Sequence, residues 1–203
     1  MKKDKDLKKL MDYAEDYVVN LAEKRILIVS VCGKKINCTE IEFRKNNFKH
    51  LSGVDSSINA NNFIEMLIDK RLSNKDWNYK KDGTTELKLK VFPEVLCIFK
   101  NARMIGVYKG NRIKLSTDLC VGGIYCYLGI AKYHNSKNNI YFPNTVISAN
   151  IKDDTNKQER IIAMFRKDKT DAQYKELTYL TKDIDFNYIK EQIEGYLSHD
   201  EYF

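Results

Sequence analysis

The sequence predicts an α+β fold in which N-terminal helices pack on an antiparallel meander sheet of four or more strands. Two observations support this fold. Apolar residues recur every three or four positions in much of the first 100 residues, which is the helical period. After residue 101 the period changes to two, and polar connectors separate the apolar runs, as in consecutive antiparallel strands. The 203 residues suit a single domain of ordinary size.

The N-terminal part predicts one helix and one hairpin. Over residues 1–25 the apolar side chains form a single stripe, which indicates an amphipathic helix. A β-branched run at 26–31, a turn containing Gly33 and a second run at 36–43 then predict two antiparallel strands. We expect these two strands to pair with each other, because the connection between them is short.

Three further helices are predicted before residue 100. A short helix around Phe48 is expected to end at Gly53, since glycine readily takes the left-handed conformation at a helix C-terminus. A second helix has an apolar face over 60–68. A third covers 84–99, with its middle interrupted by Pro93, a residue that removes a helical hydrogen bond.

The rest of the chain predicts strands and a closing helix. A hairpin is expected over 104–115, with 113–115 as its second strand. The further predicted strands are 124–133, 140–151, 158–166 and 174–181. We therefore divide the chain into an N-terminal helix at 1–25, an α+β domain at 26–182 and an acidic C-terminal helix or tail at 183–203.

Charge is unevenly distributed along the chain. The net charge is +7, yet residues 181–203 hold two lysines against six aspartates and glutamates. A basic body attracts polyanions, so the composition is compatible with RNA as a partner. The codon bias of an AT-rich genome would give the same lysine content, and that alternative stays open.

Several classes of protein are excluded by what the sequence lacks. No apolar run approaches the roughly 18 residues of a membrane span, so no membrane association is expected. The phosphate-binding, dinucleotide-binding, nucleophile-elbow and zinc-protease motifs are absent. Five scattered cysteines are interpreted as reduced core thiols, and no metal or cofactor is predicted. With no apolar signal segment at the N-terminus, we expect a cytoplasmic protein.

His50 is the first candidate for chemistry. If Phe48 and Leu51 point inward from their helix, His50 lies at the boundary between core and solvent. Histidine has the proton affinity nearest neutrality, which suits acid or base catalysis. A partly buried histidine bonded to a backbone carbonyl remains the structural alternative.

The predicted sheet supplies further polar candidates. Asn144 and Thr145 follow Pro143, a residue that favours a strand edge or a bulge. Lys167 precedes Tyr174, and a cation beside an aromatic ring suits a phosphate and a stacked base. Ordinary turn residues, a solvated hairpin tip and common sheet tyrosines are the alternatives for these positions.

Several short motifs then occur in an order that resembles one known family. They are Phe48-x-His50-Leu51-x-Gly53-Val54, Ile105-Gly106, Leu115-x-Thr117-Asp118, Leu128-Gly129 and Phe142-Pro143-Asn144-Thr145, then Lys167 and Tyr174. From about residue 26 to 181 the sequence resembles the fourth family of phage barnase-EndoU-colicin-RelE-like nucleases. The resemblance implies helices packed on a four-stranded antiparallel sheet, in toxins or phage-encoded effectors similar to metal-independent ribonucleases.

By position, the resemblance implies functional roles for His50, Asn144, Thr145 and Lys167, and Arg44 is added because it lies near His50 in sequence. The expected reaction is attack of the ribose 2′-OH on the adjacent phosphorus, leaving a 2′,3′-cyclic phosphate. The expected roles are proton transfer for His50, phosphate charge for Arg44 and Lys167, hydrogen bonds for Asn144 and Thr145, and stacking or secondary proton transfer for Tyr174.

Two other functions stay open. The chain is alternatively a catalytically inactive member of the fold that binds nucleic acid or a host protein, with His50 in a structural role. A nucleotide- or NAD-handling transferase is the third hypothesis, since compact α+β sheets hold such ligands. A protein antidote is a further possible partner of the predicted nuclease.

Overall fold

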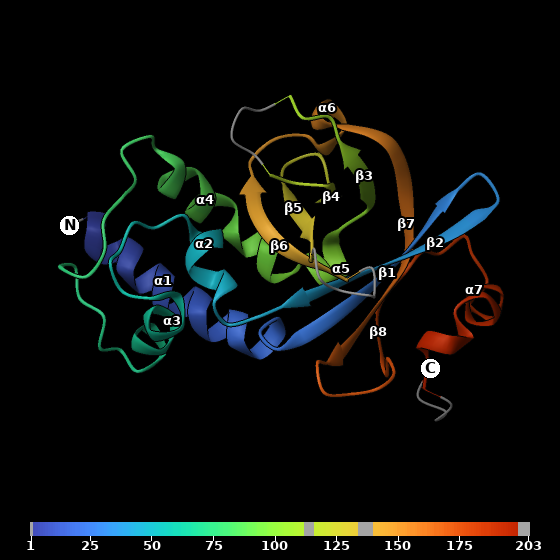
Figure 1. The fold of residues 1–203 in the computed structure, drawn as a ribbon, viewed down its shortest axis with the longest axis horizontal. Helices are drawn as coiled ribbons and strands as arrows, with labels where there is room; N and C mark the ends of the chain where they lie inside the picture. Colours follow the sequence, from blue (N-terminus) through green and yellow to red (C-terminus); the bar gives the residue numbers. More distant parts are fainter. Residues whose placement is uncertain (1, 112–115, 134–139, 199–203) are drawn as a thin grey trace.

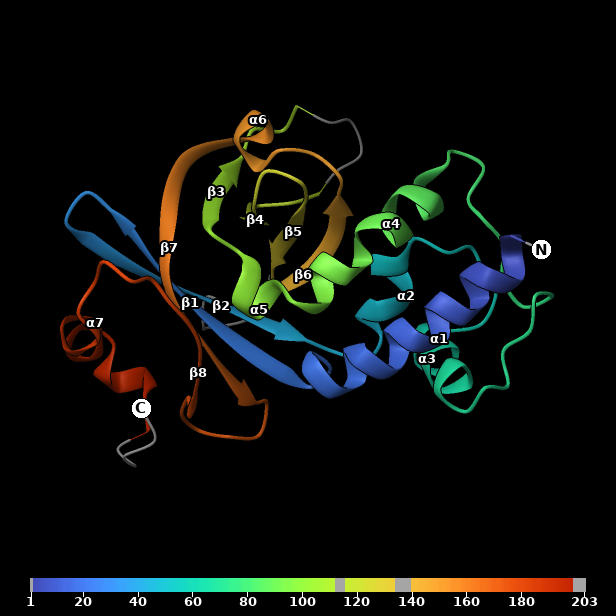
Figure 2. The same cartoon turned by 180° about the vertical axis from the view of Figure 1, so that it is seen from behind.

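We describe the fold from a computed structural model, which covers residues 2–111, 116–133 and 140–198. Helices α1 to α4 gather at one end of the molecule and α7 lies at the other, whereas α5 and α6 lie beside the strands between them (Figures 1 and 2). The described helices are α1 Lys2–Asn20, α2 Asn47–Ser52, α3 Ala60–Ile68, α4 Thr84–Leu96, α5 Ile98–Asn101, α6 Ile151–Asp154 and α7 Phe186–Gln192, followed by a 3-10 turn at Glu194–Tyr196.

Eight described strands form one sheet. They are β1 Lys24–Cys32, β2 Lys35–Phe43, β3 Met104–Tyr108, β4 Leu119–Gly122, β5 Tyr127–Lys132, β6 Ile140–Ile147, β7 Thr155–Asp168 and β8 Glu176–Leu180. Their spatial order is β1-β2-β6-β5-β4-β3-β7-β8, and β1 also pairs with β7. The first seven strands in this order therefore close into a barrel, and β8 extends the edge of β7.

The predicted helix-on-meander fold is wrong. The strands β3 to β6 do follow one another as antiparallel neighbours, although β4 is not one of the predicted strands. However, β2 pairs with β6 in parallel, through Glu40↔Ile140 and Ile41↔Tyr141, so the sheet is mixed. The antiparallel pairing of β1 with β7 then closes the ring. Both closing pairings join distant parts of the chain, and the local period of a sequence carries no signal for them.

Most individual elements lie close to their predicted positions. The β1–β2 hairpin, the short α2 helix and its end at Gly53 (φ 70°) are confirmed. The predicted third helix is continuous through Pro93 but breaks at Cys97, which separates α4 from α5. The predicted strand at 124–133 is shorter, since Gly123 and Cys126 form a turn before β5. The expected strand at 113–115 lies outside the described residues.

A main core joins the helices to one face of the barrel strands. It contains Tyr17 of α1, Phe48 of α2 and Phe92 of α4, together with Ile41 of β2 and Leu128 of β5, all almost completely buried. Burial of so many large side chains is the main source of stability. The N-terminal helix thus packs on the same core as the strands. The division into three segments stays a prediction.

A second, smaller core lies on the opposite face of β1 and β7. Leu27 and Phe165 pack there against Tyr174 and against Ile189 of α7. The cysteines are distributed differently from the prediction, because Cys120 and Cys126 are buried but Cys32 is exposed. No described helix has both the length and the apolar character required to cross a bilayer.

Candidate active site

Helix α2 positions His50 beside the sheet. Phe48, Leu51 and Ser52 are buried on its inner side, so the intervening His50 is left exposed at the helix margin. The left-handed conformation of Gly53 ends the helix immediately afterwards, and its N–H donates to the carbonyl of His50. The imidazole is therefore held on a short, anchored helix.

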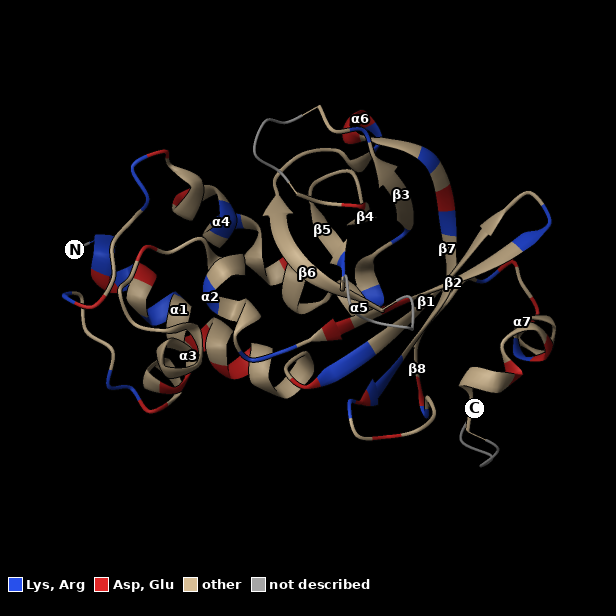
Figure 3. Ribbon diagram, in the orientation of Figure 1, with Lys and Arg blue, Asp and Glu red and all other residues tan. Residues whose placement is uncertain are grey.

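Helix α4 packs beside α2 and forms hydrogen bonds with the C-terminal end of α2. The hydroxyl of Thr85 donates to the carbonyl of Gly53 at 2.6 Å, and Nζ of Lys88 donates to the carbonyl of His50 at 3.0 Å. Both side chains are buried. Figure 3 shows basic segments on α2 and α4, the two helices that pack against β6. The α4 helix thus brings a cation next to the predicted catalytic histidine.

Strand β6 forms the opposite wall and contains a bulge. Gly129 pairs with Thr145 and Ile130 pairs with Pro143, so Asn144 is the extra residue between the two pairs. The amide nitrogen of Asn144 donates to the carbonyl of Ser116. The predicted preference of this proline segment for a bulge is confirmed, and the bulge turns Asn144 away from regular pairing.

The three walls enclose a cavity of about 480 Å³. Among the described residues, its lining combines two lysines and one histidine with hydroxyl and amide groups. The lining residues are His50, Lys80, Thr84, Leu87, Lys88, Ser116, Asn144, Thr145, Val146, Ile147 and Ser148. The structure thus brings together three of the six predicted site residues, namely His50, Asn144 and Thr145.

The surroundings of His50 favour its neutral form. Partial burial of the ring lowers the pKa of His50, and the positive charges of Lys88 and Lys80 act in the same direction. A hydrogen bond with the backbone of Asn144 opposes them without reversing the shift. Because the pKa falls below its usual 6.5, the imidazole is mainly neutral at pH 7 and is able to accept a proton.

Arg44 lies outside the lining of this cavity. Its Nε donates to Oε1 of Glu42 at 2.7 Å, and its guanidinium lies over the ring of Tyr133, 4.9 Å from the ring centre. The Glu42 carboxylate also binds Arg25 and lies 3.4 Å from Lys169. Arg44 is therefore part of a charge network around Glu42, and closeness to His50 in sequence did not bring it into the cavity.

Lys167 and Tyr174 lie together, but away from His50. Nζ of Lys167 donates to the carbonyl of Ala172 at 2.8 Å and lies 4.6 Å from the centre of the Tyr174 ring. The hydroxyl of Tyr174 donates to Glu40 at 2.8 Å, while its ring is buried in the second core. Burial raises the pKa of Tyr174, and the neighbouring Glu40 charge raises it further. This pair thus contributes to the packing of the opposite face of β1 and β7.

Lys88 is the site residue that sequence reasoning missed. Within α4 the buried positions include Lys88, Val91, Phe92 and Val95, so this lysine lies on the apolar stripe of the helix. A lysine at an inward position is unusual, because lysines are almost never fully buried without a partner. That departure from the helical pattern was the available signal.

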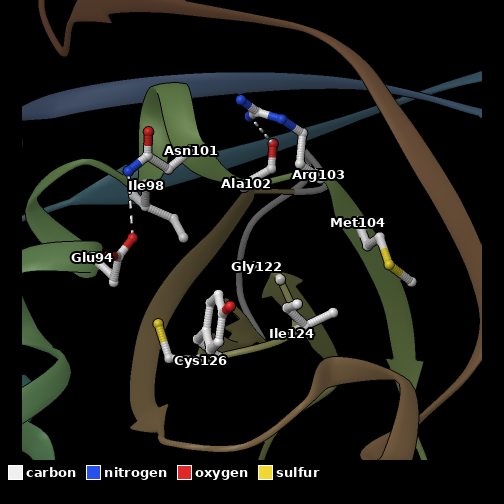
Figure 4. Close-up of a pocket in the computed structure, with 11 residues that line it drawn as sticks. Glu94, Ile98, Asn101, Ala102, Arg103, Met104, Gly122, Ile124 and Cys126 are labelled. Atoms are coloured by element: carbon white, nitrogen blue, oxygen red, sulfur yellow. Dashed lines mark hydrogen bonds between the residues drawn. The ribbon is translucent and has the colours of Figure 1, made fainter.

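A second cavity of about 260 Å³ lies between the end of α4, helix α5 and the β4–β5 turn (Figure 4). Its walls include Ile98, Met104 and Cys126. Ile124 and Tyr125 stand exposed at the turn, with 55% and 79% of their surface accessible. This lining contains none of the six predicted site residues, and the candidate active site is therefore the His50 cavity.

The barrel carries histidine, lysine, amide and hydroxyl groups in one cavity, a set of groups that suits an anionic ligand. Comparison with protein families identifies the class of protein. The family described as phage-Barnase-EndoU-ColicinE5/D-RelE like nuclease4 matches residues 9–183, and the chain belongs to this nuclease family. The resemblance found in the sequence is thereby confirmed. Searches of curated proteins and of solved structures give no significant match.

Proposed function

We propose that this nuclease cleaves RNA in the His50 cavity by attack of the ribose 2′-OH on the adjacent phosphorus. The observation that carries the proposal is the convergence of His50, Asn144 and Thr145 on one cavity, although they come from separate parts of the sequence. RNA contains its own nucleophile, so the protein has only to position the strand, move protons and stabilise charge.

His50 is proposed to act as the general base. Its lowered pKa leaves the imidazole neutral at pH 7, ready to accept the proton of the 2′-OH. As the 2′-oxygen bonds to phosphorus, the bond between phosphorus and the 5′-oxygen breaks, and the 5′-oxygen takes up a proton from solvent to become a free hydroxyl. The imidazolium of His50 then returns its proton to solvent. The products are then a 2′,3′-cyclic phosphate and a 5′-hydroxyl end.

Asn144 and Thr145 are proposed to bind the reacting phosphate or ribose. The amide of Asn144 gives one bond to Ser116 and retains a second N–H and an oxygen for a substrate. Thr145 offers a hydroxyl from the same wall of the cavity. Arg44, Lys167 and Tyr174 are left out of this proposal, because their side chains have partners elsewhere in the structure.

The test uses purified protein and a defined single-stranded RNA in EDTA. We expect fragments that end in a 2′,3′-cyclic phosphate. A matched substrate with one 2′-deoxyribose at the cut position should resist cleavage there. His50→Gln should lower the rate about 100- to 10,000-fold, the usual effect of removing a general base, while the melting temperature shows that the variant folds.

The contrary outcomes are equally specific. Equal cleavage of the 2′-deoxy substrate contradicts attack by the 2′-OH. Intact RNA that is retarded in a salt-dependent manner, with no cleavage, supports the inactive nucleic-acid-binding alternative. Unchanged cleavage by folded His50→Gln removes the histidine from the mechanism.

We also propose that the protein is a cytoplasmic, phage-encoded effector or toxin, and that a protein antidote inhibits it. This proposal is supported by the description of the family, which contains the word phage together with the names barnase and colicin. Expression in a bacterial host should arrest growth, and His50→Gln should relieve the arrest. Equal toxicity of both forms would contradict a nuclease effector of this kind.

A further inference from the structure

Lys88 holds a buried ammonium group whose charge is not balanced by an ion pair. Only 6% of the residue is accessible to solvent. Nζ donates to the neutral carbonyl of His50 at 3.0 Å, and among the described residues no carboxylate lies within ion-pair distance of it. A buried charge without a counter-charge costs several kcal/mol, and an anion bound beside this ammonium would offset much of that cost.

We propose that the His50 cavity is a phosphate-binding site and that Lys88 supplies the counter-charge of the bound phosphate. The inference deepens the proposed function and rests on it for identifying that phosphate as one of the RNA backbone. It gives Lys88 direct contact with the reacting group, which makes Lys88 a catalytic residue. Neither Arg44 nor Lys167 lines this cavity.

The other groups of the cavity suit the same ligand. Nζ of Lys88 retains two N–H groups beyond its bond to His50. Lys80 adds a second positive charge, and the hydroxyls of Ser116 and Thr145 add hydrogen-bond donors. Among the described residues, the carboxylate that raises the pKa of Lys88 is Asp82, which is not part of the lining. The cavity is therefore predominantly positive and rich in donors.

The lowered pKa of Lys88 is consistent with an anion-binding site that holds no anion. Burial, together with the smaller effect of the Lys80 charge, lowers the pKa of Lys88 from 10.5 to about 8, and the Asp82 carboxylate acts in the opposite direction. Among the described lining residues, the titratable groups besides Lys88 are Lys80 and the imidazole of His50, whereas the β6 residues of the cavity carry no charge. A bound phosphate reverses the effect, because a nearby negative charge raises the pKa of an ammonium group.

Chemical labelling of the intact protein tests the inference directly. At pH 7.5, with limiting acylating reagent, mass spectrometry follows Lys88 and the exposed Lys90 of the same helix. Inorganic phosphate should slow acylation of Lys88, by close to tenfold for each unit of pKa increase, and leave Lys90 unaffected. Equal rates at Lys88 with and without phosphate would overturn the inference, and equal slowing at both lysines would show only a general salt effect and overturn it too.

Substitutions separate this inference from the proposed function. Lys88→Met keeps the unbranched stem of the side chain without the ammonium group, Lys88→Arg keeps the charge, and Lys90→Met is the matched control. We expect Lys88→Met to lower RNA cleavage at least about 100-fold and to abolish inhibition by phosphate, with partial rescue in Lys88→Arg. Full activity of folded Lys88→Met would overturn the role of this lysine while leaving RNA cleavage established. Conversely, phosphate protection of Lys88 in a protein that cleaves no RNA would support the anion site and contradict the proposed function.

Discussion

The side-chain stem of Lys88 occupies the space next to Gly53. A Cβ atom added to Gly53 would lie 2.7 Å from Cδ of Lys88, closer than carbon atoms normally approach. Gly53 also has φ +70°, a conformation that side chains other than glycine rarely adopt. Residue 53 thus ends α2 and also leaves room for the lysine that crosses to His50.

Gly53→Ala should therefore weaken both the fold and the site. Left-handed strain costs about 1 kcal/mol or more, and overpacking against Lys88 adds about 1–3 kcal/mol. We expect a lower free energy of unfolding in urea and a loss of RNA cleavage that persists at temperatures where the variant is folded. Gly33→Ala is a suitable control, because Gly33 has a similar φ of +61° but an added Cβ would contact nothing within 4 Å. Equal effects of both substitutions would show that backbone strain alone is responsible.

Lys88→Met should change how stability depends on pH. In the folded protein the pKa of Lys88 is lowered from 10.5 to about 8, so between these values the unfolded chain binds a proton that the folded chain has lost. The free energy of unfolding of the natural protein therefore increases as the pH rises from about 8 to 10.5, because Lys88 loses its buried charge. Lys88→Met lacks that gain, and the difference between the two proteins should change by roughly 3 kcal/mol between pH 7 and pH 11. If the free energy of unfolding varied with pH in the same way in both proteins, the lowered pKa of a buried Lys88 would be contradicted.

Glu42→Gln should destabilise the protein at neutral pH. The carboxylate is 2% exposed and binds both Arg25 and Arg44. Because the two arginines are partly exposed, the expected cost is that of losing hydrogen bonds to a charged group, about 1.5–3 kcal/mol. Burial acts to raise the pKa of Glu42, but the hydrogen bonds from Arg44 and Arg25 outweigh it and lower the pKa overall.

The pH dependence provides the check on Glu42. Stabilisation by this carboxylate is complete above its usual pKa of 4.5 and is lost as pH falls through the lower folded value. Urea unfolding at pH 3, 4.5 and 7 should show a smaller loss of stability on acidification for Glu42→Gln than for the natural protein. The same acid dependence in both proteins would argue against this network.

Tyr174→Phe tests whether the phenol is structural. The variant loses the bond to Glu40 and leaves the carboxylate without that donor, which should cost about 1.5–3 kcal/mol, as for hydrogen bonds to charged groups. Thermal unfolding should show the loss directly. If stability is unchanged while RNA cleavage falls sharply, the phenol has a direct part in catalysis and the structural interpretation is wrong.

Local sequence patterns predicted the elements better than their arrangement. The β1–β2 hairpin and the short α2 helix depend on turn residues and on apolar periodicity within a few positions, and both are confirmed. The barrel depends on β2 meeting β6 and on β1 meeting β7. Such pairings depend on packing of the whole molecule, and no periodicity within one segment encodes them.

The candidate site shows the same division. His50 and the Asn144–Thr145 segment were selected from residue type and motif order, and the fold brings them into one cavity. Lys167 and Tyr174 were selected in the same way but lie in the opposite core. Lys88 was missed because it lies 38 residues from His50 in sequence, and only the packing of α4 on α2 brings its ammonium to the histidine carbonyl.

The pairing of β1 with β7 also constrains how the protein is made. β1 begins at Lys24, whereas β7 begins at Thr155, so a nascent chain has to extend beyond Thr155 before the ring is able to close. Pairing of segments that are far apart in sequence is slow, because the chain between them loses conformational entropy before the pairing stabilises it. The ribosome will therefore have synthesised the chain at least as far as β7 before the barrel forms.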